Sequence, residues 1–248
     1  MKNLIKLTFL LVAFFSFPAL LQAQNYDSGS GLRNIAGIWY NLTYSKGVGT
    51  AKVGPKLQYY KNGSTTRYYA GTYSGEITIP ETVTYSGKTY TVVGFVYPSI
   101  YQQQTGSTKG ITYPFQNSTI TKVTIPKTVT DICDHCFINS RNLVTVVYSN
   151  EITNIGINAF NNCLSLKNLV IPGIEPQDGV NLLPNKLQNL KKGAFNNCEA
   201  LESIRIPASL KTYNHQTHAG WGDETFMNCY SLKTAIIEAN GDGDTNKA

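Results

Sequence analysis

The stretch Ala159-Phe160-Asn161-Asn162-Cys163 decides the fold, because it recurs along the chain. One copy is Ala194-Phe195-Asn196-Asn197-Cys198, and a looser one is Thr225-Phe226-Met227-Asn228-Cys229. A Leu-x-x-apolar-x-apolar run follows each copy, as in Leu166-x-x-Leu169-x-Ile171. A short unit repeated in this way is typical of a stacked repeat protein, in which each copy forms one coil of a solenoid.

Each copy contains two apolar steps. The downstream run alternates apolar and polar residues and ends at a proline in Ile171-Pro172 and Ile206-Pro207, which predicts a short strand. The upstream step, as in Ile152-Thr153-Asn154-Ile155, is predicted to lie on the opposite side of the coil. The Asn-Asn-Cys segment between the two steps is too short for a regular α-helix and predicts a turn or a single 3₁₀ turn.

The spacing of the copies indicates a basic period of 23 residues. The motif phenylalanines stand at 137, 160, 195 and 226, so the steps are 23, 35 and 31 residues, and the last two steps carry insertions of 12 and 8 residues. Both insertions fall between the strand proline and the next phenylalanine. Upstream, Pro80 and Pro126 are 46 residues apart, twice the period. We interpret this interval as one repeat with a long excursion rather than a degenerate copy, because Ser86-Gly87-Lys88 predicts a hairpin.

Two segments carry a resemblance to a known family. The opening segment from Ile77 to Tyr90, and the segment Asn158 to Leu166 with its copies, are similar to the BspA-like class of leucine-rich repeat found in bacterial surface antigens. The resemblance covers about residues 75–238. It implies a right-handed, β-rich repeat solenoid with little regular helix, and a non-enzymatic adhesion or binding module.

Three of the five cysteines follow the repeated motif, and the other two depart from it. The regular ones are Cys163, Cys198 and Cys229, which we expect to form a column of buried thiols. Ser140 stands where the first full repeat lacks the motif cysteine, and Cys133 and Cys136 replace small residues. The Cys133-x-x-Cys136 pair has three interpretations: buried thiols, a local disulfide, or part of a metal site.

The ends of the chain predict export. Lys2 and Lys6, the apolar run 7–17 and Leu21-Gln22-Ala23 form a secretory signal peptide with cleavage expected near Ala23, which places the protein in the periplasm, at the cell surface or outside the cell. The apolar run is too short for a transmembrane helix. The expected organisation is a signal peptide at 1–23, a β-rich cap at 24–74, the solenoid at 75–238 and a disordered acidic tail at 239–248.

The composition separates the N-terminal part from the rest. The formal net charge is +6. Residues 24–118 hold eight Lys or Arg against three acidic residues and contain 13 of the 16 tyrosines, whereas residues 119–248 hold eleven Lys or Arg against twelve acidic residues. Tyrosine is a good strand residue, and a basic tyrosine-rich cap is also suited to a glycan. A carbohydrate site using Tyr59 in the cap and Trp221 in the last insertion is therefore the alternative function.

The favoured function is binding of a protein ligand through the concave strand face. Its expected contact residues point outward from the predicted strands and are mixed in charge, which suits a protein better than a polyanion such as nucleic acid. They are Lys122, Lys167, Asn168, Glu202 and Arg205, with Thr121, Thr124, Val170 and Ser203 beside them. A third interpretation is a structural part of a surface assembly, with self-association through the final strand at 232–237.

Catalytic and metal-binding patterns are sparse. His215 and His218, with Asp223 and Glu224, could hold zinc, and a polar surface loop is the alternative. Neither a G-x-S-x-G elbow nor a phosphate-binding glycine loop occurs, and three histidines give no Ser-His-Asp set. We therefore expect no enzymatic activity, no cofactor and no metal.

Overall fold

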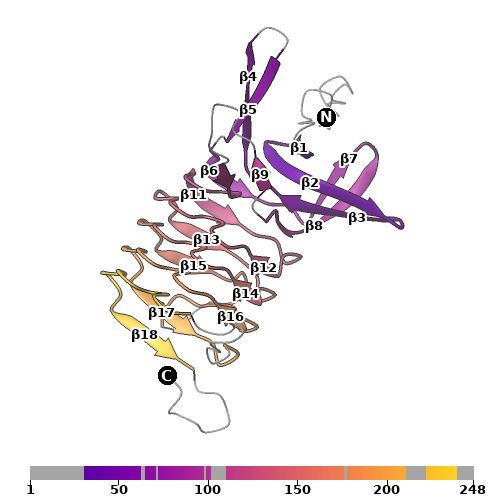
Figure 1. The fold of residues 1–248 in the computed structure, drawn as a ribbon. Coiled ribbons are helices and arrows are strands. Elements are labelled where there is room, and N and C mark those ends of the chain that lie inside the picture. Colours follow the sequence, from indigo (N-terminus) through magenta and orange to yellow (C-terminus); the bar gives the residue numbers. More distant parts are fainter. Residues whose placement is uncertain are drawn as a thin grey trace, which may run out of the picture.

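The computed structural model describes residues 31–62, 65–70, 72–97, 99–101, 110–175, 178–210 and 222–238. The regular elements in these ranges are strands, stacked from β1 at one end of the molecule to β18 at the other (Figure 1). The predicted signal peptide, the acidic tail, Trp221 and the two histidines of the last insertion lie outside the described residues.

A parallel sheet forms one side of the stack. Its strands are β6 (Ser74–Thr78), β11 (Thr119–Thr124), β13 (Thr145–Val147) and β15 (Asn168–Val170), and the parallel pair β17 (Ser203–Ile206) and β18 (Thr234–Ile237) follows them (Figure 1). Val123 pairs with Ile77 on one side and Val146 on the other. Because β6 and β11 are direct neighbours, the interval between them holds no additional coil, and the predicted excursion is confirmed.

A shorter parallel ladder runs along the opposite side of the coils (Figure 1). It consists of β12 (Asp131–Ile132), β14 (Asn154–Ile155) and β16 (Asn189–Leu190). The second residue of each strand is buried, with 1% exposure at Ile132 and none at Ile155 or Leu190. These strands are the upstream apolar steps expected from the repeat, so each coil contributes apolar side chains to the core from two sides.

A column of stacked phenylalanine rings fills the centre of the core. The neighbouring ring centroids lie 4.9, 5.1, 5.1 and 5.6 Å apart, with interplanar angles of 11°, 4°, 13° and 7°. The rings belong to Phe115, Phe137, Phe160, Phe195 and Phe226. The first four have no exposed surface. One motif position thus supplies one rung of a continuous apolar column, the stabilising arrangement of repeat proteins.

The asparagine two residues after each phenylalanine has a left-handed backbone. The φ values are 55°, 60°, 60°, 57° and 59° at Asn117, Asn139, Asn162, Asn197 and Asn228. Asparagine accepts this conformation at a lower cost than most residues, which explains its recurrence at the corner. The amide of Asn162 also donates to Asn139 Oδ1 at 2.9 Å, and that of Asn228 donates to Asn197 Oδ1 at 2.8 Å.

The motif cysteines form a column of buried free thiols, as predicted. Each thiol donates to the carbonyl of the phenylalanine in the preceding coil. Cys163, Cys198 and Cys229 reach those carbonyl oxygens at 3.3, 3.3 and 3.2 Å. Burial raises the pKa of all three thiols, to about 11 for Cys229. The column is therefore made of neutral, shielded thiols.

A five-stranded sheet closes the N-terminal end of the stack. Its order is β1-β2-β3-β8-β7, formed by β1 (Leu32–Ile35), β2 (Ile38–Ser45), β3 (Val48–Val53), β7 (Thr82–Tyr85) and β8 (Lys88–Phe95). Tyr85 pairs with Lys88, which confirms the predicted hairpin, and that hairpin joins the cap strands rather than the coils. The sheet thus combines residues from both sides of the boundary expected at 74.

Aromatic residues join the cap to the coils. The Phe95 ring, on β8, meets Phe115 and Phe137 edge to face at 6.3 and 6.1 Å. The Tyr73 ring lies 4.8 Å from that of Phe115, and its hydroxyl donates to Gly54 O at 3.0 Å. The phenylalanine column therefore ends against cap side chains instead of solvent.

Two antiparallel hairpins complete the described fold. One pairs β4 (Leu57–Asn62) with β5 (Thr65–Ala70), and the other pairs β9 (Ser99–Tyr101) with β10 (Gly110–Thr112). The β4–β5 hairpin extends beyond the cap end of the stack (Figure 1).

Candidate binding surface

The outward residues of the parallel strands form one continuous surface, here called the strand face. They occupy two rows in register. The first row holds Glu76, Lys122, Thr145 and Asn168, continued by Ser203 and Thr234, and the second holds Thr78, Thr124, Val147 and Val170, continued by Arg205 and Ile236. Three predicted contact residues, Lys122, Asn168 and Arg205, therefore lie on the same side of the stack, on β11, β15 and β17. The remaining two, Lys167 and Glu202, immediately precede β15 and β17.

The charges near the first row are paired along the stack. Lys122 Nζ lies 3.7 Å from Glu76 Oε2, and Lys167 Nζ lies 2.9 Å from Glu202 Oε1. Lys233 also approaches Glu202, at 3.8 Å. The hydrogen bond and the charge of Lys167 hold the pKa of the Glu202 carboxyl below its usual value. Exposed pairs of this kind add little stability. Their main effect is to fix the charge pattern of the surface.

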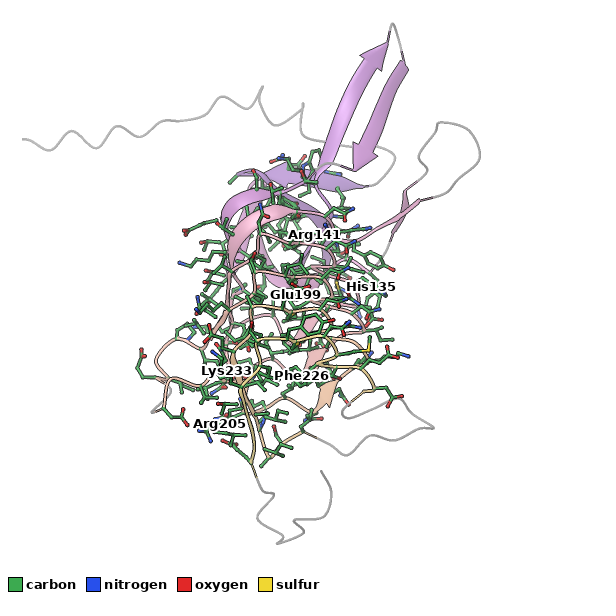
Figure 2. All side chains as sticks on the ribbon, turned by 90° about the vertical axis from the view of Figure 1, so that its left-hand side faces the viewer. His135, Arg141, Glu199, Arg205, Phe226 and Lys233 are labelled. Atoms are coloured by element: carbon green, nitrogen blue, oxygen red, sulfur yellow. The ribbon has the colours of Figure 1, made fainter. Side chains whose placement is uncertain are left out.

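Arg205 links the strand face to an inserted segment. Its guanidinium forms an ion pair with Asp178 and lies 3.9 Å from Glu238 Oε1. Figure 2 shows Arg205 and Lys233 on the same side of the C-terminal coils, with His135 on the other side in that view. The cationic residues expected to contact a ligand thus each have an acidic neighbour within the molecule.

The 12-residue insertion returns to the sheet instead of projecting as a loop. Asn181, within it, lies between β15 and β17. Its amide nitrogen donates to Lys167 O at 2.9 Å and to Ser203 O at 3.1 Å, and its Oδ1 accepts from Leu169 N at 2.8 Å. Its backbone oxygen accepts from Arg205 N at 2.7 Å. The side chain therefore replaces a backbone peptide group, and the strand face continues across the insertion.

The two residues of the predicted carbohydrate site are not brought together among the described residues. Tyr59 lies on β4 and pairs with Tyr68 of β5, in a two-stranded sheet separate from the strand face. Trp221 belongs to a stretch that the structure does not describe. The predicted alternative site therefore has no structural account.

The Cys133-x-x-Cys136 pair lies in the core. Both residues are free cysteines, with 6% and 0% exposure. The pKa of the Cys136 thiol is raised well above its usual value. Burial is the main cause, and the hydrogen bond with the neighbouring Cys133 is the second. Across the described ranges, no group of three or more His, Cys, Asp or Glu side chains could hold a metal ion. In the structure, the pair is therefore two buried thiols.

A polar cleft between the cap and the short ladder was not expected from the sequence. It has a volume of about 450 Å³. The cap contributes Lys52 of β3, the end of β8 and Tyr97, and the ladder contributes Asp131, Asn154 and Asn189. One feature of the sequence does point to the row of polar side chains: Asp131, Asn154 and Asn189 occupy the same position of the upstream apolar step. Nothing in the sequence shows that this row lies opposite the cap.

Hydrogen bonds connect the ladder residues of this cleft. Asn189 Nδ2 donates to Asn154 Oδ1, and Asn154 Nδ2 donates to Asp131 Oδ1. Thr130 Oγ1 donates to the other carboxylate oxygen of Asp131 at 2.5 Å. The chain of hydrogen bonds fixes the orientation of each side chain, so the cleft has a preset row of amide and carboxylate oxygens.

Together, the parallel strands, the phenylalanine column and the corner asparagines define a leucine-rich-repeat solenoid with a continuous strand face. The family model described as the BspA type leucine rich repeat region matches six copies over residues 109–178 and 180–242. The chain belongs to this family, which confirms the resemblance drawn from the repeated motif. Membership in this surface-antigen type of family indicates a non-catalytic repeat protein.

Several solved structures are similar to this chain. The pneumococcal vaccine antigen PcpA is 22% identical, with a TM-score of 0.47, over 85% of this chain and 51% of its own. A leucine rich cell surface protein from Faecalibacterium prausnitzii is 18% identical, with a TM-score of 0.41, over 84% and 55%. A leucine-rich repeat protein from Bacteroides capillosus is 19% identical, with a TM-score of 0.38, over 84% and 99%.

The chain spans about half the length of the first two of these structures, at 51% and 55%. No curated protein matches the sequence. Within the described ranges, no helix has the length and apolar character needed to cross a membrane.

Proposed function

We propose that the chain is an exported, non-catalytic module that binds a protein partner through the strand face. The observation that carries this proposal is the register of the outward residues, which continues from β6 to β15 and across Asn181 to β17 and β18. A continuous, rigid surface of in-register side chains needs little ordering on binding, and preorganisation of this kind favours affinity.

The charge balance of the face supports a protein partner over a polyanion. Among the described residues, the four cationic side chains on and beside this face each lie next to a carboxylate, and four carboxylates take part. The pairs are Lys122 with Glu76, Lys167 and Lys233 with Glu202, and Arg205 with Asp178 and Glu238. Nucleic-acid surfaces carry an excess of positive charge. Alternating charges instead suit a partner with a complementary pattern, because such patterns select the correct register of an interface.

Exposed apolar side chains lie beside the charges. Val144 and Val170 are 37% and 40% exposed, and Thr124 and Val147, in the same row as Val170, are partly exposed. Protein interfaces commonly combine a less polar centre with a charged rim. These residues and the predicted contacts Lys122, Lys167, Asn168, Glu202 and Arg205 would form the binding site.

The test is a binding screen of the chain from residue 24 onward against immobilised extracellular-matrix and cell-surface proteins. Charge reversal by Lys167→Glu should weaken binding by about tenfold, because it places a like charge beside Glu202 and reverses one site of the pattern. The matched control is Lys186→Glu, which disrupts the 2.8 Å pair with Glu151 away from the strand face. Equal loss in both variants, or no loss in either, would contradict the proposal.

A second candidate role is self-association through the last strand. Ile237 of β18 is 49% exposed, whereas Ile206, its register partner on β17, is 2% exposed. Among the described strands, β18 pairs with β17 alone, and a strand edge of this kind offers backbone groups and apolar surface to another chain. Sedimentation velocity at increasing concentration should show dimers that Ile237→Lys removes. A protein that stays monomeric throughout the concentration series would exclude this role.

A further inference from the structure

The cleft between the cap and the short ladder has the features of a ligand site distinct from the strand face. Its volume of about 450 Å³ falls within the range of about 300–1,000 Å³ typical of small-molecule sites. Phe95, Ile132 and Cys133 contribute buried apolar surface, and polar side chains from two separate sheets meet at its walls. We propose that this cleft binds a short, uncharged oligosaccharide.

The charges of the lining favour a neutral ligand. Two lysines, Lys52 and Lys191, and two aspartates, Asp131 and Asp134, line the cleft, so the formal charges cancel. Lys191 Nζ lies 3.9 Å from Asp134 Oδ1, which neutralises part of the charge locally. The aspartates would repel a polyanion, and the lysines would repel a polycation. A ligand with many hydroxyl groups and no charge avoids both repulsions.

The ladder presents oxygens that can bind sugar hydroxyls. Asn154 uses both of its N–H groups within the protein, on Asp131 and on Thr153 Oγ1 at 3.0 Å. The groups it offers a ligand are therefore acceptors: the second lone pair of Asn154 Oδ1 and the lone pairs of the Asp131 carboxylate, which match hydroxyl donors. Neighbouring strands are about 4.8 Å apart, so these groups repeat at nearly the length of one sugar ring in an extended chain. Because hydrogen bonds between the side chains fix their orientation, the row is preorganised for a ligand that repeats along the stack.

Asp134 is held beside this row by the close packing of two coils. Its Oδ1 accepts a hydrogen bond from Ile157 N at 2.8 Å. Gly156 makes this approach feasible, because a Cβ there would lie 2.5 Å from Asp134 N. Coil packing therefore positions one more carboxylate at the wall of the cleft.

Tyr97 supplies an aromatic surface at the rim. It is 63% exposed, although it lines the cleft. Partial burial, followed by the neighbouring Asp134, raises its pKa, so the phenol remains a neutral donor in the lining that it shares with Asp131 and Asp134. Aromatic rings pack against the apolar faces of sugars while a tyrosine hydroxyl can hydrogen-bond. An exposed ring beside a row of amides is therefore a suitable platform for a saccharide.

A β-bulge shapes the cap wall. The pairing of β3 with β8 shifts between Ala51 and Lys52, so that Ala51 faces Val92 and Lys52 faces Gly94. Gly94 has a φ of 154°, and no atom lies within 4 Å of the position that a Cβ would occupy. Bulges redirect side chains and often occur beside functional sites. Here the bulge and the missing side chain leave open space above the ladder.

The experiment is titration of the chain from residue 24 onward with neutral oligosaccharides: cello-, malto-, xylo- and chito-oligosaccharides. Calorimetry should detect saturable binding of at least one of them. Nuclear magnetic resonance should show the side-chain amide signals of Asn154 and Asn189 shifting during the same titration. Tyr97→Ala should weaken the affinity by about tenfold, the usual contribution of one aromatic contact.

Tyr230→Ala is the matched control, because Tyr230 is 77% exposed and lies on the last coil, away from the cleft. Unchanged thermal unfolding of both variants shows that any loss reflects contact rather than folding. The proposal is wrong if none of the four series binds, if Tyr97→Ala binds as well as Tyr230→Ala, or if only heparin-derived or polyamine probes bind. None of these outcomes affects the strand-face proposal, whose test uses Lys167→Glu.

Discussion

The hydroxyl of Ser140 donates to the carbonyl of Phe115 at 2.7 Å, inside the core. In the other coils a motif cysteine makes the equivalent bond to the preceding phenylalanine, at 3.2 to 3.3 Å. The serine that interrupts the cysteine pattern therefore retains the hydrogen bond of the column. A hydroxyl is a stronger donor than a thiol.

Ser140→Ala should lower the free energy of unfolding by about 1 kcal/mol, the net value of one buried hydrogen bond. Ser140→Cys should recover most of this loss, since it restores the motif donor. Urea denaturation of the three proteins measures the difference. An alanine variant as stable as the original would show that this hydrogen bond contributes nothing measurable.

Asn181→Ala should be more damaging, with a loss of about 2–3 kcal/mol. The substitution leaves the Leu169 N–H and the Lys167 and Ser203 carbonyls without the side-chain partner that joins β15 to β17. Asn185→Ala in the same insertion is the control, because that residue is exposed. Urea denaturation of both variants checks the prediction, and equal stability would contradict the bridging role of Asn181.

The motif thiols should resist alkylation in the native protein. Cys163 and Cys198 are fully buried, and burial raises the pKa of both, so little reactive thiolate forms at neutral pH. Cys229, 9% exposed and with a pKa raised to about 11, should react faster than these two. Mass spectrometry after timed iodoacetamide treatment gives the order, and all should react in urea. Rapid native labelling of Cys163 would contradict the packing.

Stability should decrease as the pH falls below about 6.5, through His135. Burial lowers the pKa of His135 in the folded chain, while the charge of Asp134 opposes the shift. Its Nδ1 is buried without a hydrogen-bond partner, and its ring stacks on Tyr113 at 4.7 Å. The unfolded chain therefore binds the proton first, and the free energy of unfolding falls until the folded pKa is passed.

His135→Asn tests this origin, because asparagine also accepts the left-handed φ of 56° found at this position. Urea midpoints at pH 7 and pH 5 should differ less for this variant than for the original chain. An identical pH dependence of the two proteins would assign the effect to other groups.

The sequence predicted the coils because a few motif residues in each turn of the solenoid determine its packing. Phe160, Asn162 and Cys163 recur at fixed spacing within the motif, and each contacts the equivalent residue or a carbonyl of the preceding coil. The hairpin at Tyr85 and Lys88 was also predictable, from local turn chemistry. Short-range patterns and strict repeats are read directly from the order of residues.

Pairings between unlike segments were not predictable. The β3–β8 pairing joins segments that share no motif, and the cleft depends on it. Asn181 looked like part of a loop, because nothing in its neighbours indicates that a side-chain amide will replace a peptide group between β15 and β17. Such features arise from the three-dimensional fit of one particular coil to the next.

The direct pairing of Ile77 with Val123 also bears on the order in which the protein folds. These residues are 46 positions apart in the chain, whereas Val123 and Val146 are 23 apart. Closing the longer segment costs more chain entropy, and it encloses a hairpin that must itself pair with β3. We expect the regular coils around Phe137 and Phe160 to form first and serve as a template on which the N-terminal end condenses.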